Sequence, residues 1–186
     1  LIRPERQRDF SIINGELGLT NFTLVQGHDW PDTEILRANG VRVITSTDFN
    51  ALYGLLKMGR ADGFPRSVAE IWPEQQAYQH FVVESQLLLH YPTAQYYFFN
   101  PEHAELAEPV RRGLLLMIEN GEFDALFERY FADDLQRSKL SQRTVIELHN
   151  PLLPEATPLK QSELWYRSDV SAGLTQTEHF INKGLP

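Results

Sequence analysis

Between residues 20 and 67 the sequence alternates short strand patterns with helical patterns, and this alternation limits the fold more than any other feature. Residues 23–25 form an apolar, β-branched run, and residues 31–39 have a helical pattern that stops at a glycine. Residues 41–45 predict the next strand, and residues 47–58 predict a helix with leucines along one stripe. This order is typical of a parallel sheet with crossover helices, so we predict an α/β fold.

The rest of the chain predicts shorter strands and longer helices. We expect a strand at 61–64, a short helix at 68–74, extended segments at 81–83 and 86–90, helices at 102–120 and 122–131, and a strand at 144–148. Pro109 lies far inside the first long helix, which predicts either a kink there or a helix that restarts near Glu108. The tail from residue 149 is rich in proline, and we expect it to wrap over the body with Trp165 and Tyr166 as anchors.

Charge and composition exclude several functions. The chain has 17 basic and 25 acidic residues and a net charge of −8, so we predict no nucleic-acid partner. It has no cysteine, which excludes disulfides, thiolate metal ligands and cysteine nucleophiles. The longest apolar run, residues 114–118, is too short for a membrane span, and we predict none. Because the sequence starts at Leu1 with no apolar leader, we expect the natural amino terminus to lie upstream.

Two loops are candidates for a binding site because each follows a predicted strand. The first contains His28, Asp29 and Trp30, at the position where open α/β sheets bind ligands. Its alternative role is structural, with Asp29 as the cap of the next helix and a proline in the first turn. The second loop contains Arg66 and Ser67. The arginine offers a planar fork for a carboxylate or phosphate, or else it is a surface residue paired with Glu70.

Catalytic chemistry has no clear signature in this chain. Carboxylates at Asp29, Glu70 and Glu74 and imidazoles at residues 28, 80 and 90 show no spacing that implies a mechanism. No P-loop, H-E-x-x-H, G-x-S-x-G or G-x-G-x-x-G motif occurs. We therefore predict no enzymatic activity, no cofactor and no metal.

Three segments together resemble one protein family. They are Gly27 to Pro31 after a strand, the run L-L-K-M-G-R-A-D at 55–62, and N-G-E-F-D-A-L-F-E-R-Y-F at 120–131. In this order they look like the bacterial extracellular solute-binding proteins of family 3, which are type II periplasmic binding proteins. The resemblance covers about residues 20 to 131, and F-P-R at 64–66 looks like a less characterised branch.

The resemblance implies a periplasmic protein in which two α/β lobes close over a solute, with parallel and mixed sheets, flanking helices and one incomplete lobe. Residues 12–88 would form the second lobe, residues 1–11 and 89–136 the returning part of the first, and residues 137–186 a wrapping extension. The opening part of the first lobe would be absent. The implied partner is the permease of an ABC-type transporter, or a sensor module.

The resemblance also implies where the ligand binds. Family members hold an amino acid with an acid after the G-R-x-D strand and with hydroxyl residues after the strand-ending glycine. Here Arg66 replaces the acid, and His28 and Asp29 replace the hydroxyl residues. We therefore predict a small polar or anionic solute bound by His28, Asp29, Trp30, Arg66 and Ser67. The alternatives are an enzyme like cyclohexadienyl dehydratase, with Asp29 or Glu70 as its acid, and a ligand-sensing module of a signalling protein.

Overall fold

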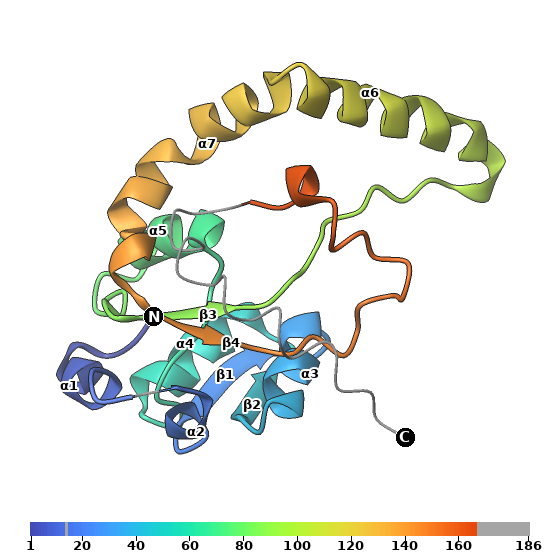
Figure 1. Ribbon diagram of the computed structural model, residues 1–186. Helices are drawn as coiled ribbons and strands as arrows, with labels where there is room; N and C mark the ends of the chain where they lie inside the picture. Colours follow the sequence, from blue (N-terminus) through green and yellow to red (C-terminus); the bar gives the residue numbers. More distant parts are fainter. Residues whose placement is uncertain (14, 167–186) are drawn as a thin grey trace, which may run out of the picture.

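The first parallel sheet forms from the strand-helix-strand segment. The computed structural model describes residues 1–13 and 15–166 (Figure 1). Strands β1 (Thr23–Gly27) and β2 (Arg42–Ser46) pair in parallel, from Thr23 beside Arg42 to Gly27 beside Ser46. Helix α3 (Pro31–Ala38) is the crossover between them, and α4 (Phe49–Lys57) follows β2. The structure is mixed α/β, as predicted, and the two-lobed arrangement stays a prediction.

Strand β1 is buried on both faces because its side chains alternate between two hydrophobic clusters. Leu24 packs in one cluster with Ile35 and Leu36 of α3. Val25 packs in the other with Leu52 and Leu56 of α4. Successive side chains of a strand point to opposite faces, so α3 and α4 cover opposite sides of this sheet.

The predicted strand at 61–64 and the predicted extended segment at 81–83 form only isolated β-bridges. Gly63 bridges Leu24 in parallel and Ile2 in antiparallel orientation, and Ile2 also bridges Val82. A Cβ atom at Gly63 would lie 3.2 Å from the Leu24 side chain, so the close approach of this segment depends on glycine. Pro65 has no N–H to continue the ladder, which is the physical reason the strand is cut short.

A second small sheet joins distant parts of the sequence. Strand β3 (Leu87–His90) pairs in parallel with β4 (Thr144–Glu147). Ile146 and Leu148 pack in the same cluster as Leu24, so the two sheets share a core. Helix α5 (Val68–Ala77) precedes β3, contains Pro73 and continues past the predicted end at residue 74.

The long helices form an arch that extends away from the sheets (Figure 1). The 3-10 helix η2 (Pro101–Leu106) leads into α6 (Ala107–Glu119), and α7 (Glu122–Ser138) returns to the body. Pro109 lies in the first turn of α6, which agrees with a helix that restarts near residue 108. Helix α7 continues past the predicted end at 131, and its last turns pack on α5, where Trp72 Nε1 donates to Ser138 Oγ at 2.8 Å.

The segment after β4 is attached to the body by side-chain amides. The Asn39 amide donates to the His149 carbonyl at 2.8 Å and accepts from the His149 N–H at 2.9 Å. The Tyr166 ring lies 5.3 Å from that of Phe127 on α7 but is 54% exposed, so its role as an anchor stays a prediction. Residues 167–186 of the predicted extension lie outside the described residues.

Short helices complete the described chain: η1 (Pro4–Arg6), α1 (Gln7–Phe10), α2 (Gly15–Leu19), η3 (Leu140–Gln142) and η4 (Ser162–Leu164). None of the helices in the described part of the chain is both long enough and apolar enough to cross a membrane.

Candidate functional site

A cavity of about 530 Å³ lies where the end of β1, the loop before α5 and strand β3 meet. This volume is within the usual range for small-molecule sites, roughly 300 to 1,000 Å³. Apolar side chains form much of the wall, among them Leu24, Leu36, Phe64, Ile71, Leu87 and Leu89. The polar and charged lining residues are Gln26, Asp32, Arg66, Ser67, Glu70, Glu84, His90, Tyr91, Thr93, Gln95, Ser138 and Arg143.

Gln26 is a buried polar residue of the cavity lining. It is 2% exposed, and strand alternation places it on the same face of β1 as Leu24. Its Nε2 faces the Pro65 carbonyl at 3.4 Å, which fixes the orientation of the amide because only the NH₂ group can donate there. Its Oε1 is buried and accepts no hydrogen bond from the described residues. An unmatched buried acceptor costs about 1–3 kcal/mol.

Arg66 lines the cavity but directs its guanidinium at two carboxylates of α5. Its Nη2 lies 2.6 Å from Glu74 Oε1 and 3.1 Å from Glu70 Oε2, and its Nε donates to Glu74 at 2.8 Å. The guanidinium carbon also lies 4.9 Å from the Trp30 ring centroid and 5.2 Å from that of Phe64. Burial disfavours the charge, but the bonds to Glu74 outweigh it and raise the pKa of Arg66. Arg66 pairs with Glu70 as the structural alternative predicted, but at 9% exposed its side chain is not a surface residue, and its role in ligand binding stays a prediction.

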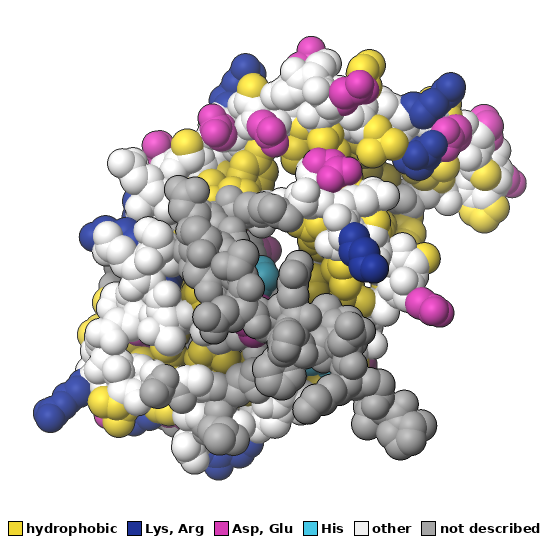
Figure 2. Space-filling model, viewed as in Figure 1, with side chains coloured by type: hydrophobic (Ala, Val, Ile, Leu, Met, Phe, Trp, Pro, Cys, Tyr) yellow, Lys and Arg dark blue, Asp and Glu magenta, His cyan; other side chains and the backbone are white. Residues whose placement is uncertain are grey.

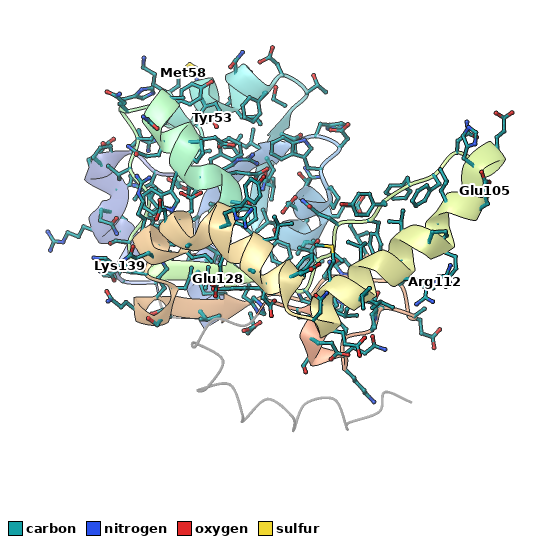
Figure 3. The ribbon with its side chains drawn as sticks, turned by 90° about the horizontal axis from the view of Figure 1, so that it is seen from above. Tyr53, Met58, Glu105, Arg112, Glu128 and Lys139 are labelled. Carbon is teal, nitrogen blue, oxygen red and sulfur yellow. The ribbon has the colours of Figure 1, made fainter. Side chains whose placement is uncertain are left out.

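Glu74 connects Arg66 to a buried tyrosine of α4. Tyr53 donates to Glu74 Oε2 at 2.5 Å and is 3% exposed. Burial, followed by the bond to Glu74, raises the pKa of the Tyr53 phenol above its ordinary value. Figure 3 shows Tyr53 on the side of the body formed by α4 and α5. The carboxylate of Glu74 thus accepts from two side chains behind the cavity wall.

Asp32 and Tyr91 join α3 to the segment after β3 at another part of the wall. The Tyr91 hydroxyl donates to Asp32 Oδ1. Burial is the main cause that raises the pKa of the Tyr91 phenol, and the bond to Asp32 adds to it. Because an ionised carboxylate accepts several hydrogen bonds, Asp32 keeps capacity for a further donor.

Arg143 is the second guanidinium of the lining, and it binds backbone carbonyls. Its Nη1 donates to the carbonyls of Glu84 at 2.6 Å and Leu87 at 2.9 Å, and its Nε donates to that of Ser138 at 2.6 Å. Burial lowers the pKa of Arg143 below its ordinary value, and the nearby Glu84 carboxylate offsets part of this effect. The side chain is 10% exposed. Through these carbonyls it connects the end of α7 to the start of β3.

The structure separates the five predicted site residues into two groups. Trp30, Arg66 and Ser67 line the cavity together. His28 and Asp29 are exposed on the turn after β1 and lie outside the lining. The Trp30 indole packs directly against Gly27. This packing requires a glycine, because a Cβ atom at residue 27 would lie 2.3 Å from the indole. The expected cap at Asp29 is wrong, because Trp30 is the N-cap residue of α3.

Sequence reasoning did not select Gln26, Asp32 or Tyr91 for the site. Gln26 had a detectable signal, since it is the polar residue in a strand that is otherwise apolar near its carboxyl end. Tyr91 gave no such signal, because its contact with Asp32 joins residues 59 positions apart. Within the described part of the chain, no group of three or more His, Cys, Asp or Glu residues is arranged to hold a metal ion.

Comparison with known proteins identifies no relative that assigns a role to this cavity. No family model matches the chain, and no curated protein and no solved structure matches it.

Proposed function

We propose that this protein binds a small solute in the cavity beside β1 and releases it unchanged. The single observation that supports this most is the cavity on which the two strand-end loops converge, with Trp30, Arg66 and Ser67 in its lining. The cavity volume and its mixture of apolar walls and few polar groups also fit a small-molecule site.

The resemblance to solute-binding proteins extends this proposal to a biological setting. On that basis we place the protein in the periplasm, where it would deliver the solute to an ABC-type transporter or present it to a sensor module. The enzymatic alternative assigns the acid to Asp29 or Glu70. Asp29 lies outside the lining, and the Glu70 carboxylate is engaged by Arg66 at 3.1 Å and by the Ser67 N–H at 3.4 Å. These contacts favour binding over catalysis.

Retention of a compound by matched variants tests the proposal. The full chain and the variants Gln26→Leu and Gln142→Leu are incubated with the small-molecule fraction of a bacterial extract, purified again and denatured, and released compounds are measured by mass spectrometry. Gln142 is exposed and lies outside the lining, so it is the matched control. We expect the wild type and Gln142→Leu to retain a common compound, and Gln26→Leu to retain at least tenfold less.

The stability of the same variants gives a second, independent readout. Gln26→Leu removes an unmatched buried acceptor, so ligand-free Gln26→Leu should be more stable than the wild type by about 1 kcal/mol. A damaged fold would instead lower both stability and retention. The proposal is wrong if the wild type retains no compound, or if Gln26→Leu retains as much as the wild type. Recovery of a converted compound would support the enzymatic alternative.

A further inference from the structure

Strand β3 pairs with β4 along one edge, and its other edge, the open edge, has no partner strand among the described residues. The N–H groups of Thr144 and Leu148 donate to the carbonyls of Gln86 and His90, so the even-numbered residues of β3 direct their backbone groups at β4. In a parallel ladder the backbone groups of alternate residues point to opposite edges. The odd-numbered residues of β3 therefore direct their N–H and C=O groups at the open edge.

The two residues on the open edge differ in how their backbone groups are satisfied. The Leu87 N–H donates to Glu84 Oε2 at 2.6 Å, and the Leu87 carbonyl accepts from Arg143 Nη1 at 2.9 Å. The N–H and C=O of Leu89 have no such side-chain partner, and they make no hydrogen bond within the described part of the chain. Unpaired backbone groups on a strand edge are the groups that bind an added strand.

The cavity lies along this open edge. All residues from 87 to 91 line it, and no residue of β4 does. Because the side chains of a strand alternate between two faces, a cavity over one face would contact every second residue. Contact with consecutive residues, and with none of the paired strand, places the cavity beside the open edge. Past β3 the lining continues at Thr93 and Gln95 and omits residues 92 and 94, which is the pattern of an extended segment.

The rest of the cavity suits the side chains of an extended peptide. Leu24, Phe64, Ile71 and Leu140 are apolar residues of the lining. The four residues of β3 span about 13 Å at roughly 3.3 Å per residue, which is the length of about four peptide residues. The cavity thus offers both a backbone edge and apolar walls over this length.

We infer that the cavity takes a short extended peptide of about four apolar residues, which adds to β3 as a further strand. The peptide exchanges backbone hydrogen bonds with the N–H and C=O of Leu89. Its side chains pack against the apolar walls and decide which sequences are accepted. This inference rests on the proposed function, because it names the class of solute that the same cavity binds.

Calorimetry of the full chain with three tetravaline peptides tests the strand addition. The parent peptide is acetylated and amidated, and its uniform sequence makes every register equivalent. One derivative is N-methylated at the second and third residues, which blocks both edges of its backbone. The other is N-methylated at the second and fourth residues, which leaves one edge open. We expect the derivative with one open edge to bind within about threefold of the parent, and the derivative with both edges blocked to bind at least tenfold more weakly.

Matched proline variants test the same contact from the protein side. Leu89→Pro removes an N–H on the open edge and no hydrogen bond to β4, which is a position where a strand tolerates proline. Thr45→Pro is the control on the other sheet: the Ser46 carbonyl accepts from the His28 N–H, so the neighbouring Thr45 N–H points away from β1. Leu89→Pro should weaken binding of the parent peptide at least tenfold, and Thr45→Pro should leave it unchanged.

Hydrogen exchange of the wild-type chain keeps the test decisive if Leu89→Pro fails to fold. The parent peptide should slow exchange of the Leu89 N–H at least tenfold, whereas the N–H groups of Leu88 and His90 face β4 and should change little. The inference is overturned if the parent peptide does not bind, if it leaves exchange at Leu89 unchanged, or if blocking both of its edges leaves affinity unchanged. Retention of a compound from the extract judges the proposed function separately, so the two failures are distinguishable.

Discussion

Arg66 and Glu74 form a nearly buried ion pair enclosed by aromatic rings. Their side chains are 9% and 15% exposed, and the rings of Trp30, Phe49 and Phe64 lie around the guanidinium. Isolated charges at this depth would be unstable, because each has lost most of its contact with water. The pair is therefore a requirement of the fold on the side of the cavity nearest α5.

Loss of Arg66 should affect stability more than binding. Arg66→Ala leaves the Glu74 carboxylate without its cation, and breaking a buried pair typically costs about 3–5 kcal/mol. Arg66→Lys should recover part of this, because it keeps the charge but loses the fork and the ring contacts. The double variant Arg66→Met with Glu74→Gln should be more stable than Arg66→Ala. Urea unfolding measures all three, and equal stability of Arg66→Ala and the wild type would show that the pair is dispensable.

The buried Tyr53 phenol should make the stability of the fold depend on pH in the alkaline range. Its pKa is raised in the folded state by burial and by Glu74, so its contribution to stability is complete below the unfolded phenol pKa of about 10 and is lost as the pH rises toward the folded value. The free energy of unfolding should therefore fall as the pH rises above about 10. Tyr53→Phe should show a shallower fall over this range. Tyr97, which is 71% exposed, provides the control variant Tyr97→Phe with an unchanged slope.

At the residue scale, sequence reasoning succeeds where a contact is local and fails where it crosses the fold. The pairing of Arg66 with Glu70 follows from helical spacing and is present at 3.1 Å. The stronger contact with Glu74 lies one turn further along α5 and depends on how the loop before the helix approaches it. The orphaned oxygen of Gln26 is visible only once both faces of β1 are known to be buried.

The same limit applies at the scale of elements. Helices α3 and α4 and strands β1 and β2 follow from local periodicity and lie close to their predicted bounds. The pairing of β3 with β4 joins residues 57 positions apart, and no local pattern specifies it. Helix α7 exceeds its predicted length because Trp72 on α5 holds its last turn. Tertiary contacts therefore decided both the second sheet and the end of this helix.

Arg143 should stabilise the second sheet selectively. It binds carbonyls from the end of α7 and from both sides of the start of β3, so Arg143→Met leaves all three acceptors unmatched. We expect a loss of at least about 3 kcal/mol in the free energy of unfolding. Hydrogen exchange should show faster exchange in β3 and β4 than in β1. Arg112→Met, on the exposed surface of α6, should leave exchange in both sheets unchanged.

At the scale of the whole molecule, α6 and α7 carry many apolar side chains that the described residues leave exposed. No residue of α6 is buried. Figure 2 shows hydrophobic side chains along the inner side of the arch, and Figure 3 shows Glu105 and Arg112 on its far arm, away from Tyr53 and Met58. The large exposed apolar residues of the arch are Leu106, Leu115, Leu116, Phe123, Leu126 and Tyr130, and Tyr96, Tyr97 and Phe98 are exposed on the preceding segment. Soluble monomers rarely expose an apolar surface of this extent.

We therefore expect the 186-residue chain to self-associate through the arch. Burial of these side chains favours association, whereas the many acidic residues of α6 and α7 repel a second copy, so added salt should strengthen association. Sedimentation velocity over roughly 1 to 100 μM should show a sedimentation coefficient that rises with concentration. The double variant Leu116→Gln with Tyr130→Gln should weaken association at least tenfold, because its positions are 58% and 71% exposed on the arch. Ile12→Gln, a change at a 78% exposed apolar residue in the turn after α1, should have no effect. A chain that stays monomeric at both low and high salt would show that the arch tolerates water.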